Sequence, residues 1–337
     1  MSERSRAAVT IVTYNSARYI RQCLECVLAQ EPSPGEIVVV DNASADETRT
    51  MLREFQDRVR VVYNADNRGF AGGHNQAIAL TSAPWVLVLN PDVGLPANFM
   101  TEMVVAGERE ARIGTVTGKL RAMNADLQIP AQPLLDSTGI YFTPTMRHFD
   151  RGSKEPDHGQ YEEPEYVFGA TGAAALYRRE MIADVSIDGE FFDEDFFAYR
   201  EDADLAWRAQ LLGWHCVYTP RAVAYHVRSV LPTNRRQVSA AVNMHSVKNR
   251  WYLRMKNMTP DLYRRHWFAI RMRDAVIVAA CLLREWSSLR AFAVVIRNAA
   301  KMREKHREIM RRRRVSDEYI AKWFAERPTS FPIGDNE

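Results

Sequence analysis

Carboxylates that could bind a cation or a nucleotide follow two apolar runs in the amino-terminal half of the chain. Asp92 closes the segment Asn90, Pro91, Asp92 directly after WVLVL, and Asp41 closes IVVVD. Mg²⁺ and Mn²⁺ take oxygen ligands, usually with one or two carboxylates, so Asp92 is a candidate cation ligand. Asp41 could accept hydrogen bonds from a base or ribose. Simpler roles stay open, a Pro-Asp turn for Asp92 and a helix cap for Asp41.

A second acidic group and a histidine lie far along the chain. Glu201 and Asp202 follow the aromatic and acidic run 191–199 and open a helical pattern. A carboxylate at a helix start, beside bulky apolar neighbours, is a reasonable general base, whereas Asp204 is expected only to favour the helix dipole. His226, in YHVRS, is a further candidate cation ligand, although a lone histidine more often has a structural role.

The segment NRGFAGGHN, residues 67–75, is a glycine-rich turn that opens a helix. Glycines allow close approach of a ligand to the backbone, and a helix amino terminus offers free N–H groups to phosphate or ribose oxygens. The segment matches neither G-x-G-x-x-G nor the Walker pattern, which argues against a nicotinamide-dependent oxidoreductase or a P-loop protein. Taken alone, it could be a simple turn.

Alternating elements must position these groups. Strand patterns at 8–13, 36–40, 59–63 and 85–89 alternate with helical patterns at 17–30, 48–55 and 72–81. This predicts an α/β fold with a mostly parallel sheet and helices on both faces, and ligands at the carboxyl ends of the strands. Residues 101–166 read as less regular, followed by a helix at 202–212 and a strand at 216–219. From Arg235 onward the pattern is helical, so we predict a catalytic domain at 1–234 and a basic helical region at 235–337.

Composition limits the class of protein. The chain has 337 residues, of which 46% are hydrophobic and 26% charged, as in globular proteins. Its four cysteines are too few and scattered for a disulfide framework, which favours a reducing compartment, and the pair Cys23 and Cys26 falls in a helical pattern. A strand begins by Val9, and the longest late apolar stretch, 275–283, is far short of a membrane span. We therefore expect no signal peptide, no membrane crossing and a cytoplasmic location.

The carboxyl-terminal region is strongly basic. Between Arg235 and Arg314 the sequence has 17 arginines and 4 lysines against 5 acidic residues, a net charge of +16 in a chain of net charge +3. Arginines beside Trp267, Phe268, Ile277 and Leu282 could lie on an anionic membrane surface, which suits a lipid-linked acceptor. A solvated or homo-oligomer-forming helical face is the equal alternative. No recognisable nucleic-acid-binding motif accompanies Arg311 to Arg314, so nucleic acid is not expected.

Seven motifs in order carry a family resemblance: VTIVTYN, VVVDNASAD, NRGFAGGHNQA, VLVLNPDV, GATGAAALYRR, FFAYREDADLAWR and YHVRS. Together, across residues 9–228, they resemble the inverting glycosyltransferase family 2, which has the Rossmann-like GT-A fold. The resemblance implies transfer of a sugar from a nucleotide diphosphate to an acceptor hydroxyl, with inversion and with Mg²⁺ or Mn²⁺. It implies that Asp41 holds the base, that Asp92 and His226 hold the metal, and that Asp202, paired with Glu201, is the catalytic base.

The resemblance also implies a wider site. The nucleotide-sugar residues would be Thr13, Tyr14, Asn15, Asp41, Asn67, Arg68, Gly69, Gly73, Asn75, Asn90, Pro91 and Asp92, and the sugar side would include Gly172, Ala173 and Trp207. One departure is Asn90, which stands where the family usually has the first aspartate of Asp-x-Asp and supplies no charge. Metal binding must then depend on Asp92, His226 and the diphosphate.

The substrates are less constrained than the reaction. NPDV with NRGFAGGHN resembles the rhamnosyltransferase and galactofuranosyltransferase branches, so dTDP-rhamnose is the first expected donor and a UDP-sugar the alternative. The expected acceptor is a glycan or lipid-linked sugar in cell-surface polysaccharide or glycolipid synthesis. A catalytically silent nucleotide-sugar-binding module of the same fold stays open. Transfer from dTDP-rhamnose and transfer from a UDP-sugar both require Asp92, Asp202 and His226 to meet at one cleft.

Overall fold

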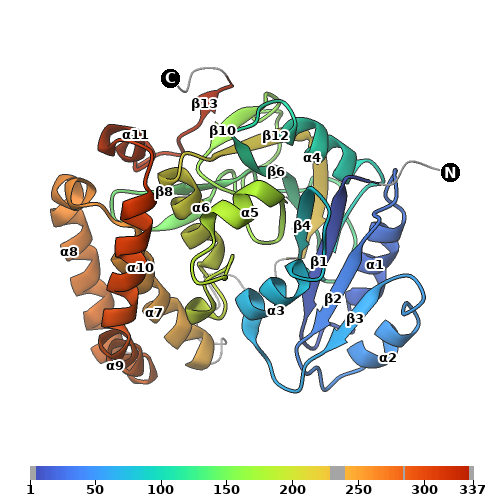
Figure 1. Cartoon of the computed structure of the whole chain (residues 1–337), viewed down its shortest axis with the longest axis horizontal. Coiled ribbons are helices and arrows are strands. Elements are labelled where there is room, and N and C mark those ends of the chain that lie inside the picture. Colours follow the sequence, from blue (N-terminus) through green and yellow to red (C-terminus); the bar gives the residue numbers. More distant parts are fainter. Residues whose placement is uncertain (1–4, 228–239, 284, 334–337) are drawn as a thin grey trace.

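The structure is a computed structural model that describes residues 5–227, 240–283 and 285–333 (Figure 1). The strands are β1 (Ala7–Thr13), β2 (Ile37–Asp41), β3 (Arg60–Tyr63), β4 (Trp85–Leu89), β5 (Val93–Gly94), β6 (Ile113–Ala122), β7 (Leu135–Ser137), β8 (Ile140–Phe142), β9 (His148–Asp150), β10 (Glu165–Val167), β11 (Ala174–Arg178), β12 (His215–His226) and β13 (Phe331–Pro332). The helices are α1 (Ile20–Leu28), α2 (Thr48–Arg53), α3 (Gly69–Ile78), α4 (Phe99–Gly107), α5 (Arg179–Val185), η1 (Glu194–Phe196), α6 (Glu201–Leu211), α7 (Ala240–Asn257), α8 (Pro260–Leu283), η3 (Trp286–Leu289), α9 (Arg290–Arg297), α10 (Ala299–Arg312) and α11 (Asp317–Ala321).

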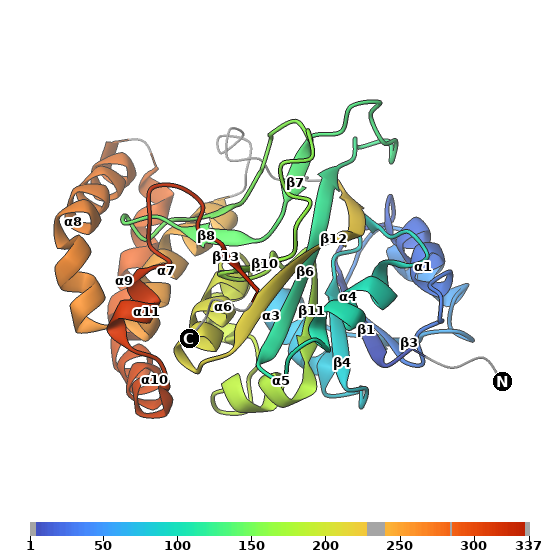
Figure 2. The ribbon, with the colours of Figure 1, turned by 90° about the horizontal axis from the view of Figure 1, so that it is seen from above.

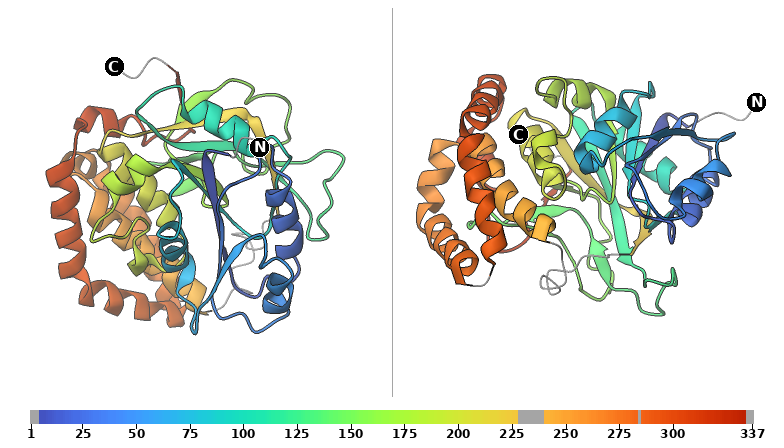
Figure 3. Two further views of the ribbon diagram at one scale, coloured as in Figure 1. Left: turned by 45° about the vertical axis from the view of Figure 1, so that its right-hand side comes forward. Right: turned by 90° about the horizontal axis from the view of Figure 1, so that it is seen from below.

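One large sheet carries the fold, in the order β13-β10-β12-β6-β11-β4-β1-β2-β3. Strands β4, β1, β2 and β3 are mutually parallel, and β12 is parallel to β6. Helices α1 and α2 cover one face of the β1–β3 part and α3 covers the other (Figure 3). The predicted α/β class, with a mostly parallel sheet between helices, is confirmed. Its strands β1, β2 and β4 are buried, which explains why they appear in the sequence as continuous apolar runs.

The middle of the chain is more regular than predicted. Residues 101–166 contain most of α4 and the whole of β6, which lies beside β12 in the centre of the sheet (Figure 2). Strand β6 has the sequence IGTVTGKLRA and is almost wholly buried. Its glycines and threonines interrupt the apolar pattern by which a buried strand is recognised in a sequence. Strand β12 also runs past the predicted 216–219 to His226, because its pairing with β6 resumes after a register shift between Thr219 and Val223. The proline at position 220 marks this irregularity rather than the end of the strand.

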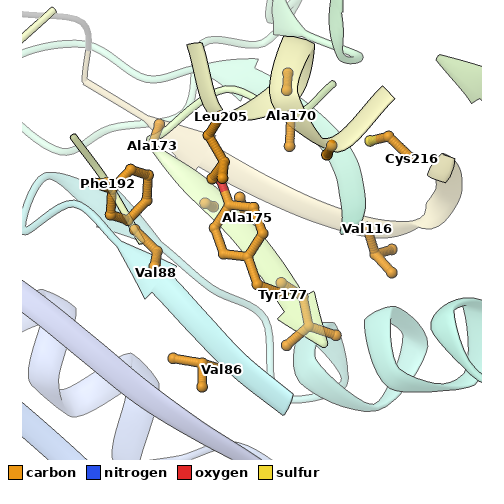
Figure 4. Close-up of a cluster of buried hydrophobic side chains, with 14 of the residues drawn as sticks. Val86, Val88, Val116, Ala170, Ala173, Ala175, Tyr177, Phe192, Leu205 and Cys216 are labelled. Atoms are coloured by element: carbon orange, nitrogen blue, oxygen red, sulfur yellow. The ribbon is translucent and has the colours of Figure 1, made fainter. Parts of the chain in front are cut away.

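A single hydrophobic core joins the sheet to the helices that follow it. This core contains Tyr177 of β11, Leu205 of α6 and Phe192, which lies between α5 and α6 (Figure 4). It continues to Tyr252 and Leu253 of α7. The predicted helical region is present as α7 to α11. The boundary predicted between residues 234 and 235 falls outside the described residues and stays a prediction. None of the helices in the described ranges has the length and apolar character that a bilayer crossing needs.

Buried ion pairs attach the basic helices to an acidic part of the first 227 residues. Asp204 is fully buried and accepts hydrogen bonds from Arg208 Nε at 2.9 Å, Lys256 Nζ at 2.8 Å and Asn257 Nδ2 at 2.8 Å. Asp193 lies 2.5 Å from Lys256 Nζ and 2.7 Å from Lys305 Nζ. Burial opposes ionisation of Asp193, but these two lysines hold its pKa well below the usual range. Asp204 therefore does more than favour the helix dipole, since it anchors α7 to α6.

The first prediction concerns this anchor. Lys256→Met should lower the free energy of unfolding by about 3 kcal/mol, because it removes one partner from a fully buried set of charges. Urea denaturation followed by circular dichroism measures the change. Lys301→Met is the matched control: Lys301 also pairs with an aspartate, Asp195, but its side chain is half exposed, so its loss should cost under about 1 kcal/mol. Equal effects of the two substitutions would contradict the anchoring role.

Candidate functional site

The carboxyl ends of β1 and β2 place Thr13 and Asp41 side by side, since these residues are partners in the parallel register. Asp41 is fully buried, and its Oδ2 accepts from Arg49 Nε at 2.6 Å and Ser44 N at 3.3 Å. Among the described residues, neither Asp41 Oδ1 nor Thr13 Oγ1 has a hydrogen-bond partner, although both atoms are buried. Buried polar atoms are almost always satisfied, so this unpaired acceptor and hydroxyl suit a polar ligand at the edge of the sheet.

The loop after β1 is fastened to the loop after β2. Asn15, at φ +52°, receives a hydrogen bond from Ala45 N on its Oδ1 at 2.8 Å, and its own N–H donates to Ser44 Oγ at 2.9 Å. These bonds leave the Tyr14 side chain 52% exposed beside Asp41. Tyr14 is therefore available to cover a flat ligand bound at Thr13 and Asp41.

The glycine-rich turn is built for contacts within the protein. Gly69 begins α3 at φ +71°, its N–H donates to Asn67 Oδ1 at 2.8 Å, and a Cβ there would lie 2.3 Å from the Phe197 carbonyl oxygen. A Cβ at Gly73 would lie 2.8 Å from Val12. Close packing of α3 against β1 and against residues 195–200 therefore accounts for both glycines. Arg68 precedes the helix with an exposed side chain.

Asn75 is engaged inside the protein at both ends of its amide. Its Nδ2 donates to Phe192 O at 2.8 Å and its Oδ1 accepts from Phe192 N at 2.9 Å. These bonds attach α3 to the chain that leads to α6. A role for Asn75 in nucleotide-sugar binding stays a prediction, and the observed bonds show a positioning role.

Asp92, His226 and Asp136 form a row at the end of β12. Strand β5 pairs with β12 so that Val93 faces His226, which sets His226 Nε2 3.4 Å from Asp92 Oδ1. The other ring nitrogen, Nδ1, lies 2.8 Å from Asp136 Oδ2. Burial alone lowers the pKa of His226, but the hydrogen bonds with Asp136 and Asp92 outweigh it and raise the pKa to about 9. Asp136 fixes the ring so that Nε2 points at Asp92.

This row fits a divalent cation with two protein ligands. A histidine that donates one N–H to a carboxylate presents its other nitrogen to a metal, and neighbouring ligands of one small cation lie about 3 Å apart. The described part of the chain contains no group of three or more His, Cys, Asp or Glu that could hold a metal. A cation between Asp92 and His226 would thus need further oxygens from a ligand such as a diphosphate. Sequence reasoning missed Asp136, which lies in the short strand β7 and belongs to no local motif.

Asp202 lies at the first turn of α6 with both carboxylate oxygens bonded to backbone. Gly172 N donates to Oδ2 at 3.1 Å and Ala203 N donates to Oδ1 at 2.7 Å. Burial raises the pKa of Asp202, the Gly172 N–H lowers it and the charge of Asp150 raises it, with a raised pKa as the net result. A raised pKa brings an aspartate closer to the range that suits a general base.

Glu201, its neighbour, differs in environment. It is 6% exposed, and burial together with the charge of Asp202 raises its pKa to about 8. At neutral pH Glu201 is therefore mostly protonated, while Asp202 is the more exposed of the two and has backbone donors for its charged form. Of the predicted catalytic pair, Asp202 is the group suited to accept a proton.

Residues 172 and 173 bring the two halves of the predicted site together. Ala173 O accepts from Asn90 N at 2.8 Å, and Gly172 N donates to Asp202 Oδ2 at 3.1 Å. The turn with Pro91 and Asp92 and the start of α6 are thus joined to the same two residues of one chain segment. The convergence required of Asp92, His226 and Asp202 is consistent with these contacts.

Trp207 does not lie on the sugar side. Its ring is fully buried and packs edge-on against Phe142 at 5.2 Å and tilted against Phe324 at 4.8 Å, as measured between centroids. It has no exposed surface with which to contact a sugar, because it lies on the buried face of α6. The expectation for Trp207 is corrected accordingly.

Comparison with known proteins agrees with this geometry. Residues 8–186 match the family model described as Glycosyl transferase family 2. Poly-beta-1,6-N-acetyl-D-glucosamine synthases of Staphylococcus epidermidis and of Staphylococcus aureus strain COL are 22% and 21% identical over 221 residues, which is 64% of this chain and 48% of each relative. The chain thus spans about half the length of these curated relatives.

Two solved structures share the fold. One is GalNAc-T7 with UDP, GalNAc and Mn²⁺ (TM-score 0.55, 15% identity, 66% of this chain and 44% of that one). The other is the mannosyltransferase PcManGT from Pyrobaculum calidifontis with GDP-Man and Mn²⁺ (TM-score 0.52, 18% identity, 94% of this chain and 85% of that one). These likenesses support the GT-A fold, and the family match covers more than half of the chain. The chain belongs to glycosyl transferase family 2.

Proposed function

We propose that the protein is an inverting glycosyltransferase that moves a sugar from a nucleotide diphosphate to an acceptor hydroxyl. The observation that carries the proposal is the pair of contacts through which Gly172 and Ala173 join Asp202 to the Asn90–Asp92 turn. These contacts support the proposal, because a displacement at an anomeric carbon requires a proton acceptor and a cation-binding carboxylate in one site. The family match supports the same reaction class.

In the proposed mechanism, Asp202 accepts the proton of the acceptor hydroxyl while that oxygen forms a bond to the anomeric carbon. The bond from that carbon to the diphosphate oxygen breaks, and its electron pair leaves with the nucleotide. General base catalysis of this kind contributes roughly 10²- to 10⁴-fold in rate. Mg²⁺ or Mn²⁺, when held by Asp92 and His226, would neutralise the departing diphosphate. Asp41 and Thr13 bind the base or ribose through their unpaired atoms.

The proposed donor and acceptor follow from the motifs and from the relatives. The motifs around Asn67 and Asn90 resemble rhamnosyltransferases, which supports dTDP-rhamnose as first donor, with galactofuranosyl or other UDP-sugars as alternatives. Relatives named as polysaccharide synthases support an acceptor in cell-surface polysaccharide or glycolipid synthesis. Binding and turnover of dTDP-, UDP- and GDP-sugars, each with and without Mn²⁺, tests the donor. Nucleotide-sugar binding with neither transfer nor metal-dependent hydrolysis would favour the silent module.

We further propose that the basic region lies on an anionic membrane surface at the cytoplasmic face. Helix α8 is at the outer edge of the molecule in two views (Figures 1 and 2). Large exposed hydrophobic residues lie along it from Trp267 to Leu283. Phe268, Leu283 and Trp286 are 63%, 77% and 73% exposed. Exposed arginines, including Arg264 and Arg271, accompany them, so lipid phosphates would supply the negative charge that the face lacks. A second copy of the chain, which would form a homo-oligomer, is the competing occupant.

Asp202→Asn should lower the rate of transfer at least about 100-fold, because the amide cannot accept the proton. The dissociation constant for the donor should change little, since Asp202 bonds only to backbone in the structure. Steady-state kinetics and calorimetric titration measure the two quantities. Asp188→Asn, an exposed aspartate in the loop after α5, is the control and should transfer normally. Near-normal turnover by Asp202→Asn would refute the assignment of the base.

Asp136→Asn should weaken Mn²⁺ binding in the presence of UDP by about 10-fold, because it removes the charge that orients His226. His226→Ala should weaken it further, since it removes a proposed ligand. Electron paramagnetic resonance titration of free Mn²⁺ measures the affinity. Asp126→Asn removes an exposed aspartate paired with Arg18 and should leave the affinity unchanged. Wild-type affinity in both Asp136→Asn and His226→Ala would exclude this row as the cation site.

Replacement of Trp267, Phe268 and Leu283 by serine should reduce flotation with phosphatidylglycerol vesicles several-fold, because it removes exposed apolar surface. Phosphatidylcholine vesicles should bind the wild type weakly. Val105→Ser with Ile129→Ser, two exposed apolar residues far along the chain from α8, is the matched control. Should the triple variant instead lower the molar mass in light scattering and leave flotation unchanged, the face joins copies of the chain and the membrane proposal fails.

A further inference from the structure

The six residues before α6 include three with a strained backbone. In the segment 195–200, Phe197, Tyr199 and Arg200 have φ values of +66°, +68° and +73°, in the left-handed region that side chains with a Cβ avoid. Arg200 directly precedes α6, so the conformation of this segment sets where Glu201 and Asp202 begin. Such a conformation persists only where the surroundings hold it in place.

One side chain of α7 supplies most of that restraint. Asn249 is fully buried, and its Nδ2 donates to the carbonyl oxygens of Phe196 at 2.9 Å, Ala198 at 2.9 Å and Tyr199 at 2.6 Å. Within the described part of the chain, its Oδ1 has no hydrogen-bond partner. The opposite orientation of the amide would place that oxygen against three carbonyl oxygens, so the two N–H donors must face the segment.

Neighbouring groups secure the same segment from both sides. On α7, Lys248 Nζ donates to Asp195 O, and the His245 ring stacks on Phe197 at 4.9 Å between centroids. On α3, Ala71 N donates to Phe197 O at 3.2 Å, next to the Gly69 position that has no space for a Cβ. The segment thus lies between the glycine-rich turn and α7, and it ends at the base.

We propose that Asn249 is a positioning residue for catalysis: by holding the 195–200 carbonyls, it fixes the start of α6 and with it the place of Asp202. The catalytic role rests on the proposed function, whereas the structural part does not. A base displaced by about 1 Å loses on the order of 100-fold in rate even when the ligand still binds. The carboxyl-terminal helices therefore contribute to the active site through one amide.

The test uses the full chain with Asn249→Ala, which removes the donors, and Asn249→Asp, which keeps the shape but not the N–H groups. Hydrogen–deuterium exchange of peptides covering residues 195–203 should increase in both variants and needs no substrate. With a dTDP- or UDP-sugar that the wild type turns over, kcat should fall about 100-fold while the donor KM stays within about threefold. Asn298→Ala is the control, because Asn298 bonds α7 through Tyr252 Oη at 2.7 Å, whereas the bonds of Asn249 go to the 195–200 carbonyls themselves.

The outcomes separate the two proposals. Unchanged exchange at 195–203, or increased exchange with a normal kcat, overturns the positioning role. An equal loss of kcat in Asn298→Ala would reduce Asn249 to general support of α7 and would also overturn it. If Asn249→Asp fails to fold, Asn249→Ala gives the result, since it introduces no charge. A wild type that transfers no sugar from any donor refutes the proposed function alone, while the exchange measurement still decides whether Asn249 holds the segment.

Discussion

The site depends on the position of β11, the antiparallel strand inserted between β4 and β6 in an otherwise mostly parallel sheet. Because β11 pairs with β4 in the opposite direction, the residues that enter it lie at the carboxyl end of β4. Gly172 and Ala173 occupy that place, and their N–H and C=O groups reach Asp202 and Asn90. The bond to Asn90 joins backbone to backbone and the bond to Asp202 ends on its carboxylate, so two adjacent residues connect two segments that are distant in the sequence.

Ion pairs with the carboxyl-terminal helices hold the residues around α6 in place. Lys256 and Lys305 neutralise Asp193 and Asp204 in the interior, so part of the charge of the basic region serves to attach it to the protein. Removing ions from water is costly, and the cost is offset here because each carboxylate has several donors. The outward arginines of α8 have a different environment, because they are exposed and their hydrogen-bond partners, Asp261 and Tyr263, lie on the same helix.

The sequence was sufficient to predict the sheet, and it indicated candidate site residues whose roles stay predictions, because both leave local signals. Buried parallel strands such as β4 read as apolar runs, and Asp41, Asp92 and Asp202 directly follow a strand or open a helix. Asp136 and Asn249 could not be found this way, since their roles come from long-range contacts. Asp136 contacts His226, 90 positions later, and Asn249 contacts Tyr199, 50 positions earlier. Trp207 was misplaced because the direction of a helical side chain depends on which face of α6 is buried, and Phe142 and Phe324 decide that.

The long-range bonds to the acidic segment also bear on the order of events during synthesis. Asp193 bonds to Lys305, 112 residues later, and Asp195 to Lys248, 53 residues later. A ribosome that has released only the sheet and α6 has not yet made the lysines and the amide that hold the strained residues before Asp202. The sheet can therefore form before these contacts, because domains fold progressively from the amino terminus. Residues 195–200 gain their bonds from Lys248 and Asn249 only after α7 has left the exit tunnel.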